Sequence, residues 1–240
     1  MELRSLFKYS LASVLALSGA VQASTDASLE SRYQAAVADA KVATVAEVSR
    51  DLVAISHNTP ELVWKSDQDS VLVLTWTGWD GYDKQVGQPV TLQREVWVTP
   101  APYLQEFCKA KRSQLSDEAL ILRLEQLMGL PPHNGKTRFV EMWVQAGDLF
   151  RPSPDPAITD HEAELDFPVA TGMTVSQSHK DWINNLKSSS YGNNGYPWTR
   201  LGYTYDWGDD SPVGLSEFVI REKAVITVKD VKSLNSYCGL

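Results

Sequence analysis

Apolar and polar positions follow three different patterns along the chain. Residues 1–23 carry Arg4 and Lys8 ahead of a short run of apolar and small residues, which is the pattern of a secretory signal peptide. Apolar residues then recur at helical spacing, and further along strand-like and helical patterns alternate. We therefore expect a signal peptide at 1–23, an N-terminal helical segment at 24–57 and a single α+β domain at 58–240.

The segment 24–57 carries a narrow apolar stripe. It is rich in alanine, and its larger apolar residues recur every three or four positions, which predicts one or two helices. Pro60 ends the pattern, because the residue before a proline avoids the helical conformation. The residues of the stripe are Leu29, Tyr33, Ala36, Val37 and Ala40.

Strand patterns are clearest at 70–77, 94–99, 137–145 and 224–231. The first, "SVLVLTWT", is almost continuously apolar and β-branched, which predicts a strand buried on both faces. The third, "TRFVEMWVQ", alternates instead. Its even-numbered residues are therefore predicted on one face of a sheet, and its odd-numbered residues, Glu141 among them, on the other.

Helical patterns are expected at 100–111, 116–129 and 179–187. For the second of these, Ser116 is predicted to cap the start, and Gly129 to supply the left-handed residue after the end. Helices and strands are interleaved without a regular β-α-β repeat. We therefore predict an α+β fold, with a mostly antiparallel or mixed sheet and helices packed on it.

The net charge is −8, and cleavage of the signal peptide would make it more negative because 1–23 holds more basic than acidic residues. Such a chain repels nucleic acid and anionic membranes, so we expect neither nucleic-acid binding nor membrane insertion after the leader is removed. No motif indicates a cofactor.

The chain contains two cysteines, Cys108 and Cys238, both beyond the predicted leader. An even number of cysteines in an exported protein predicts a disulfide. Unpaired thiols are the alternative reading, because the spacing of two cysteines in sequence does not fix their geometry. Together with the leader, the cysteines predict a periplasmic or secreted protein.

The stretch "GLPPHNGKT", from Gly129 to Thr137, ends like a phosphate-binding loop. A phosphate loop has four residues between its first glycine and Gly-Lys, follows a strand and opens a helix. Here five residues intervene, two of them prolines without an N–H group, and the stretch follows a predicted helix. The sequence therefore argues against nucleotide binding and predicts a helix stop followed by a turn.

Two clusters mix aromatic and acidic residues in loop-like sequence, and all eight tryptophans lie beyond the leader. Aromatic rings stack on sugars or prolines, and carboxylates accept hydrogen bonds, so such clusters suit a ligand surface. The alternative is that the rings fill a core. The predicted ligand-binding residues are Trp79, Asp80 and Tyr82 in one cluster and Trp198, Tyr203, Asp206 and Trp207 in the other.

Hydrolysis of a glycosidic bond would need two carboxylates, one on each side of the scissile bond. Glu141 lies between bulky apolar neighbours, which favours a tightly held proton, and Asp206 lies between two aromatic residues. These two residues are the candidates for such a pair. A charge on the exposed face of an edge strand would explain Glu141 equally well.

The loop at 155–166 is rich in Asp and Glu and contains His161. Its spacing matches neither a zinc-protease motif nor a calcium-binding loop, so we expect a solvated acidic loop and no metal. The sequence as a whole favours a non-catalytic binding protein for a glycan, a peptide or an envelope protein. The alternative is a hydrolase of an envelope polymer that uses paired carboxylates, with or without the assistance of a metal ion.

Overall fold

The structure is a computed structural model that describes residues 26–67, 69–169, 174–192 and 194–239. The predicted signal peptide at 1–23 lies outside these ranges. Within them, none of the helices has the length and apolar character that a membrane span requires.

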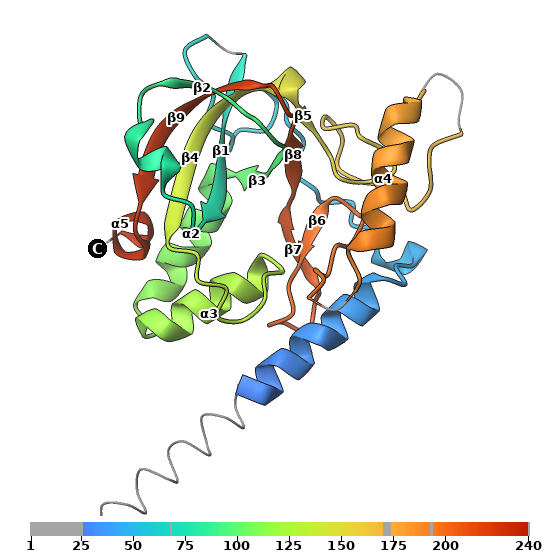
Figure 1. The fold of residues 1–240 in the computed structure, drawn as a ribbon, viewed down its shortest axis with the longest axis horizontal. Coiled ribbons are helices and arrows are strands. Elements are labelled where there is room, and N and C mark those ends of the chain that lie inside the picture. Colours follow the sequence, from blue (N-terminus) through green and yellow to red (C-terminus); the bar gives the residue numbers. More distant parts are fainter. Residues whose placement is uncertain (1–25, 68, 170–173, 193, 240) are drawn as a thin grey trace, which may run out of the picture.

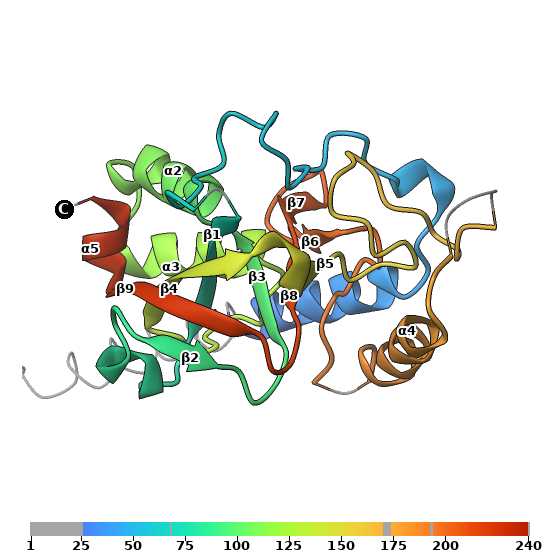
Figure 2. The ribbon, with the colours of Figure 1, turned by 90° about the horizontal axis from the view of Figure 1, so that it is seen from above.

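The predicted α+β fold is confirmed, and its main element is a seven-stranded sheet (Figures 1 and 2). Every pairing in this sheet is antiparallel. A second, two-stranded sheet pairs β6 (Tyr203–Tyr205) with β7 (Val213–Ser216). The large sheet has the spatial order β2 (Pro89–Thr91), β9 (Val225–Lys232), β4 (Arg138–Gln145), β1 (Ser70–Thr77), β3 (Val96–Pro100), β8 (Phe218–Ile220) and β5 (Leu149–Phe150).

Alternation along β1 and β4 sorts their side chains into two cores, as the sequence predicted. Val71 and Val73 of β1 belong to the same cluster as the even-numbered residues of β4. Leu72 and Leu74 face the other way and join Phe139 of β4. Strand β1 is central in the sheet and buried on both faces, which explains its almost continuous apolar sequence.

Three helices cover the second of these faces, α2 (Ala101–Arg112), α3 (Asp117–Leu127) and α5 (Leu234–Cys238). Figures 1 and 2 both place them together at one end of the molecule. The predicted disulfide is confirmed: Cys108 of α2 is bonded to Cys238 of α5, with a Cα–Cα distance of 5.2 Å. Both cysteines are buried, so the bond lies within the core under these helices.

Helix α3 begins and ends where the sequence predicted. The Ser116 side chain accepts a hydrogen bond from the backbone N–H of Ala119 at 3.3 Å. After the helix, Gly129 adopts a left-handed conformation with φ 62°. The N–H of Leu130 then donates to the carbonyl of Glu125 at 2.8 Å, which satisfies one of the last carbonyl groups of the helix.

The N-terminal helix spans 26–40 in the described part of the chain and uses the predicted stripe. Tyr33, Ala36 and Val37 pack against Trp207, which follows β6. The helix therefore covers the small sheet rather than the large one (Figure 1). Helix α4 (Gln177–Ser189) lies toward the same end, and the remaining short helices are η1 (Val45–Glu47), η2 (Gly81–Lys84) and η3 (Ala146–Asp148).

Strands β1 and β3 pair over a very short length. Their register joins Val73 to Pro100 and Leu74 to Thr99, and no further pair follows among the described residues. Beyond this point β1 stays with β4, while β3 pairs with β8. The two strands therefore diverge, and the wedge between them opens toward η2 and the end of α3.

Candidate functional site

Two adjoining clefts occupy this wedge, and we call them together the groove. The first cleft, of about 520 Å³, lies among β1, β3, η2 and residues 90–95, which run from the end of β2 toward β3. The second cleft, of about 370 Å³, extends past the end of α3 to the C-terminal part of α4 and residues 196–198. The two clefts have six lining residues in common, which are Trp97, Met128, Leu130, Lys136, Thr204 and Glu217.

Lys136 is held at the groove by the loop that follows α3. The buried Glu125 carboxylate accepts hydrogen bonds from the backbone N–H groups of His133 and Asn134, at 3.1 and 3.0 Å. The Asn134 side chain in turn accepts the backbone N–H of Lys136 at 2.8 Å. This chain of contacts fixes the backbone of Lys136, and burial lowers the pKa of its amino group.

Glu217 enters the groove from the bend between β7 and β8. Its backbone N–H donates to the carbonyl of Gly202 at 2.9 Å, and the next residue, Phe218, pairs with Val98 of β3. Burial raises the pKa of Glu217 to about 8. Among the described residues, its carboxyl has no ion-pair or hydrogen-bond partner. A carboxylic acid that is protonated at neutral pH therefore lines the groove.

Aromatic rings form part of the groove wall. Trp79 is 48% exposed and meets Tyr82 edge-on, with ring centroids 4.7 Å apart. Gly81 makes this possible, because any side chain there would collide with the indole of Trp79. Trp97 stacks on Trp182 of α4 at 6.2 Å. The wall thus offers both an exposed ring face and firmly packed rings, which suits stacking on a flat ligand.

The first predicted aromatic cluster lies at the groove. Trp79 and Tyr82 line the first cleft, whereas Asp80 is exposed at the start of η2 and lines neither cleft. From the second cluster, Trp198 lines the second cleft. Its ring is 5% exposed, and its Nε1 donates to the carbonyl of Pro152 at 3.0 Å.

The other residues of the second cluster lie away from the groove. Tyr203 is buried, and its hydroxyl donates to the carbonyl of Glu47 at 2.8 Å. Trp207 is buried beneath the N-terminal helix, and its Nε1 donates to the carbonyl of Leu130 at 2.9 Å. Asp206 accepts two hydrogen bonds from the Arg123 guanidinium, at 2.9 and 2.6 Å. Of the second cluster, Trp198 alone therefore joins Trp79 and Tyr82 in lining the groove.

Glu141, the other candidate for catalysis, is a buried and paired charge. Its carboxylate accepts hydrogen bonds from Lys229 at 2.8 Å and from Lys232 at 3.1 Å. Strand β4 is an interior strand of the sheet, so the exposed edge position considered from the sequence is wrong for this residue. Glu141 and Asp206 each have a cationic partner, and neither lines the groove.

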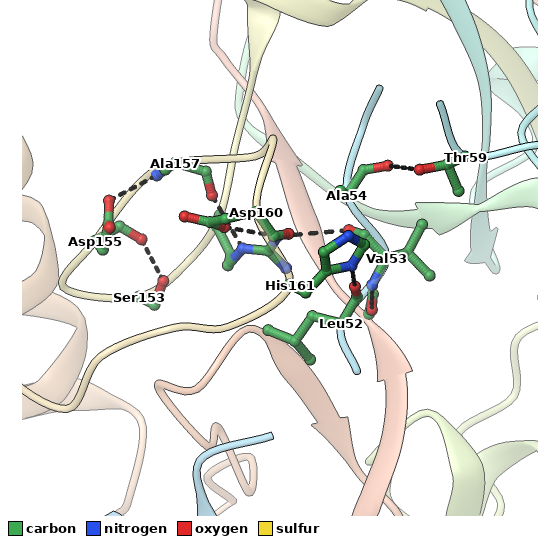
Figure 3. A network of polar contacts seen from close by, with 11 residues as sticks. Leu52, Val53, Ala54, Thr59, Ser153, Asp155, Ala157, Asp160 and His161 are labelled. Carbon is green, nitrogen blue, oxygen red and sulfur yellow. Dashed lines mark hydrogen bonds and ion pairs between the residues drawn. The ribbon is translucent and has the colours of Figure 1, made fainter. Parts of the chain in front are cut away.

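The acidic loop at 155–166 is solvated only in part: His161 and Asp166 are exposed, whereas Asp155 is buried and the loop folds around Arg151. This arginine is fully buried, and its guanidinium donates to the carbonyl groups of Ala157 and Asp160, both at 3.0 Å. Figure 3 shows Asp160 and His161 beside the segment with Leu52, whose carbonyl contacts the His161 ring at 2.7 Å. Among the described residues, no three His, Cys, Asp or Glu side chains are placed to hold a metal ion.

Sequence reasoning missed Lys136 and Glu217. Lys136 is part of the rejected phosphate loop, and Glu217 follows Ser216 in an ordinary strand pattern. No local signal marks Glu217, because the residues that share the two clefts with it, such as Trp97 and Met128, are distant in sequence. The Gly-Lys pair after an Asn turn is the one signal that could have drawn attention to Lys136.

Compared with protein-family models, with curated proteins and with solved structures, the chain gives no match. The geometry of the groove is therefore the basis for a functional conclusion.

Proposed function

We propose that this protein is an exported binding protein whose groove holds part of an extended ligand without converting it chemically. The observation that carries this proposal is the set of six residues shared by the two clefts, with Lys136 and Glu217 among them. Two polar side chains with displaced pKa values, in an aromatic and apolar groove, are typical of a ligand site.

The length of the groove favours an extended ligand over a compact one. Trp79 lines the first cleft alone, and Tyr196 and Leu186 line the second cleft alone. Trp79 and Tyr196 are both large and about half exposed, so each cleft has an accessible aromatic ring. A glycan or peptide segment would contact both clefts, whereas a single small molecule would fill one.

The proposal of export has two supports. One is the leader pattern of 1–23 described from the sequence. The other is the buried disulfide between Cys108 and Cys238, a bond that persists in oxidising compartments. Both fit a periplasmic or secreted protein.

Titration with oligosaccharides and with extended peptides, followed by tryptophan fluorescence and calorimetry, tests the binding proposal. We expect one of these ligand classes to bind and Trp79→Ala to weaken its binding about tenfold or more. Trp64→Ala is the matched control, because Trp64 lies outside the groove, where its ring contacts that of His57 with centroids 4.1 Å apart. Absence of binding by every ligand, or equal losses in both variants, would overturn the proposal.

A hydrolase remains the second candidate, and one observation favours it. A general acid works best with a pKa near the working pH, and Glu217 has a pKa of about 8. Glu95 is a second carboxylate at the first cleft, where it accepts a hydrogen bond from Trp182 at 2.7 Å. Release of shorter products from a bound polymer, abolished by Glu217→Gln and retained by Glu222→Gln, would favour this reading over simple binding.

A further inference from the structure

Two strands of the large sheet present free backbone edges to the first cleft. In an antiparallel sheet, the N–H and C=O groups of successive residues point alternately to the strands on either side. Pro100 has no N–H group, so the last bonds between β1 and β3 are exchanged by Leu74 and Thr99. The register would next join Trp76 to Trp97, and this pair is absent from the described part of the sheet. The backbone groups of these two residues therefore point into the wedge.

The neighbouring hydrogen bonds agree with this alternation. On β1, the N–H of Leu72 donates to the carbonyl of Val63 at 2.9 Å, on the side away from β4. Trp76 has the same parity along the strand, so its backbone also points away from β4. On β3, Val98 pairs with β8, and the backbone of the preceding residue, Trp97, points the other way. The edges of β1 and β3 that face each other across the wedge are therefore free.

The first cleft lies in the plane of the sheet, between these two edges. It is lined by the consecutive residues 75–77 of β1 and 96–99 of β3. Successive side chains of a strand point to opposite faces, so a cleft on one face would be lined by every second residue. On β3, Val96 and Trp97 are half-buried, and Arg94 just before the strand is exposed. The cleft therefore gives access to the free edge of β3.

A free strand edge within a sheet is complementary to an extended polypeptide. The N–H and C=O groups of a peptide strand recur toward one side at every second residue, as those of β3 do. In this mode of recognition the main chain provides affinity and alternate side chains provide specificity. The second cleft continues the groove past Met128, Leu130 and Trp198, where an apolar side chain of the peptide would pack.

Charge in the first cleft favours an acidic peptide. Arg94 and Lys136 line this cleft, and their charged groups have no ion-pair or hydrogen-bond partner among the described residues. Of the two acidic residues there, Glu95 accepts a hydrogen bond from Trp182, and burial keeps Glu217 protonated near neutral pH by raising its pKa to about 8. Two unpaired cations in a chain of net charge −8 indicate a ligand that brings carboxylates of its own.

From these observations we infer that the first cleft binds an acidic, extended segment of a partner protein as an added β-strand. The segment lies in the wedge, pairs through its main chain with Trp97 of β3 and places its carboxylates near Arg94 and Lys136. This inference rests on the proposed binding function and names its ligand class.

Calorimetric titration with designed peptides tests the inference. The probes are a capped octapeptide in which valine and glutamate alternate, the same peptide with glutamine or lysine in place of glutamate, and an uncharged tetrasaccharide. We expect the glutamate peptide to bind best and the glutamine peptide to bind about tenfold more weakly. N-methylation of one set of alternate residues should abolish binding, and N-methylation of the other set should preserve it, because only one edge of the peptide pairs with β3.

Arg94→Gln should weaken binding of the glutamate peptide about threefold or more. Arg50→Gln is the matched control, because Arg50 is an exposed arginine that lines neither cleft. Its affinity should equal that of the wild type.

Amide hydrogen exchange followed by NMR reports the strand pairing directly. In the free protein, the N–H of Trp97 should exchange about tenfold faster or more than the N–H of Val98, which is bonded to β8. The glutamate peptide should slow exchange at Trp97 toward the rate at Val98. Equal protection of both amides in the free protein would show that the edge of β3 is not free.

The outcomes separate this inference from the binding function. Binding of the tetrasaccharide without binding of any peptide would overturn the added strand and leave the binding function standing. Peptide binding that is equally sensitive to both sets of N-methyl groups, or that leaves exchange at Trp97 unchanged, would also overturn the added strand. Equal affinity for the glutamate and lysine peptides, or equal losses in Arg94→Gln and Arg50→Gln, would overturn the acidic ligand class. Failure of every probe would overturn both proposals.

Discussion

Glu217 and Lys136 line both halves of the groove, and burial drives their pKa values in opposite directions. For each residue the shift favours the uncharged form. Both side chains are thus removed from water at the place where the two clefts meet.

Glu217 should make the protein less stable as the pH rises. Its pKa is about 8 in the folded protein and 4.5 as an ordinary glutamate, so between these values the folded state holds a proton that the unfolded state lacks. The free energy of unfolding therefore falls as the pH rises from about 4.5 to 8. Glu217→Gln should remove this slope and exceed the wild type in stability by about 2–4 kcal/mol near pH 8.5.

Urea unfolding at several pH values measures this difference, and the two proteins should agree near pH 4. Glu222→Gln is the control, because Glu222 is exposed on the turn between β8 and β9. Parallel curves for the wild type and Glu217→Gln across this range would contradict the raised pKa.

The disulfide should contribute substantially to stability. It joins residues 130 positions apart, and a loop of this length in the unfolded chain is worth about 2–5 kcal/mol. Changing both Cys108 and Cys238 to alanine should lower the Tm by about 5–15 °C in differential scanning calorimetry. A reducing agent should lower the Tm of the wild type and leave that of the double variant unchanged.

Asp206 should act on stability and not on binding. Asp206→Asn breaks the two-point contact with Arg123, whose side chain is only 17% exposed, and should cost about 1–3 kcal/mol. Chemical denaturation measures the loss, while titration should give an unchanged ligand affinity. Asp209→Asn should cost less than about 0.5 kcal/mol, because Asp209 is exposed and lies 3.9 Å from the same arginine. Loss of ligand affinity in Asp206→Asn would show that Asp206 belongs to the site.

Arg151 should be among the most sensitive positions outside the apolar core. Arg151→Met leaves the carbonyl groups of Ala157 and Asp160 without their donors and should cost about 3 kcal/mol or more. Arg50→Met is the comparison, because the pair of Arg50 with Glu162 is well exposed and should contribute little. Equal unfolding curves for the two variants would contradict the structural role of Arg151.

Much of the fold could be predicted because its signals are local. Ser116 and Gly129 fix the ends of α3 through caps that involve only near neighbours. The alternation in β4 fixes which side chains share a face, and each of the two cysteines of the chain has one possible intramolecular partner. The caps and the alternation depend on backbone geometry and residue type within a few positions. The disulfide follows from the number of cysteines.

The site was harder to predict because it depends on contacts that are distant in sequence. Glu217 follows a serine in an ordinary strand pattern, and the residues that line the groove with it, such as Trp97 and Met128, are distant in sequence. Trp79 and Trp207 look alike in sequence, yet the first lines the groove and the second anchors the N-terminal helix. Burial, which decides between these roles, is a property of the assembled fold.

The early separation of β1 from β3 has a consequence for engineering. Because the first cleft lies in the wedge between them, part of its wall comes from residues 92–95 between β2 and β3, while the sheet pairings of β1 with β4 and of β3 with β8 remain complete. The exposed residues of this segment, Gln93 and Arg94, can be exchanged without altering the strands that carry the fold, whereas the buried Leu92 belongs to the core. The scaffold is therefore suited to libraries in which selectivity is varied at its rim while the interior is held constant.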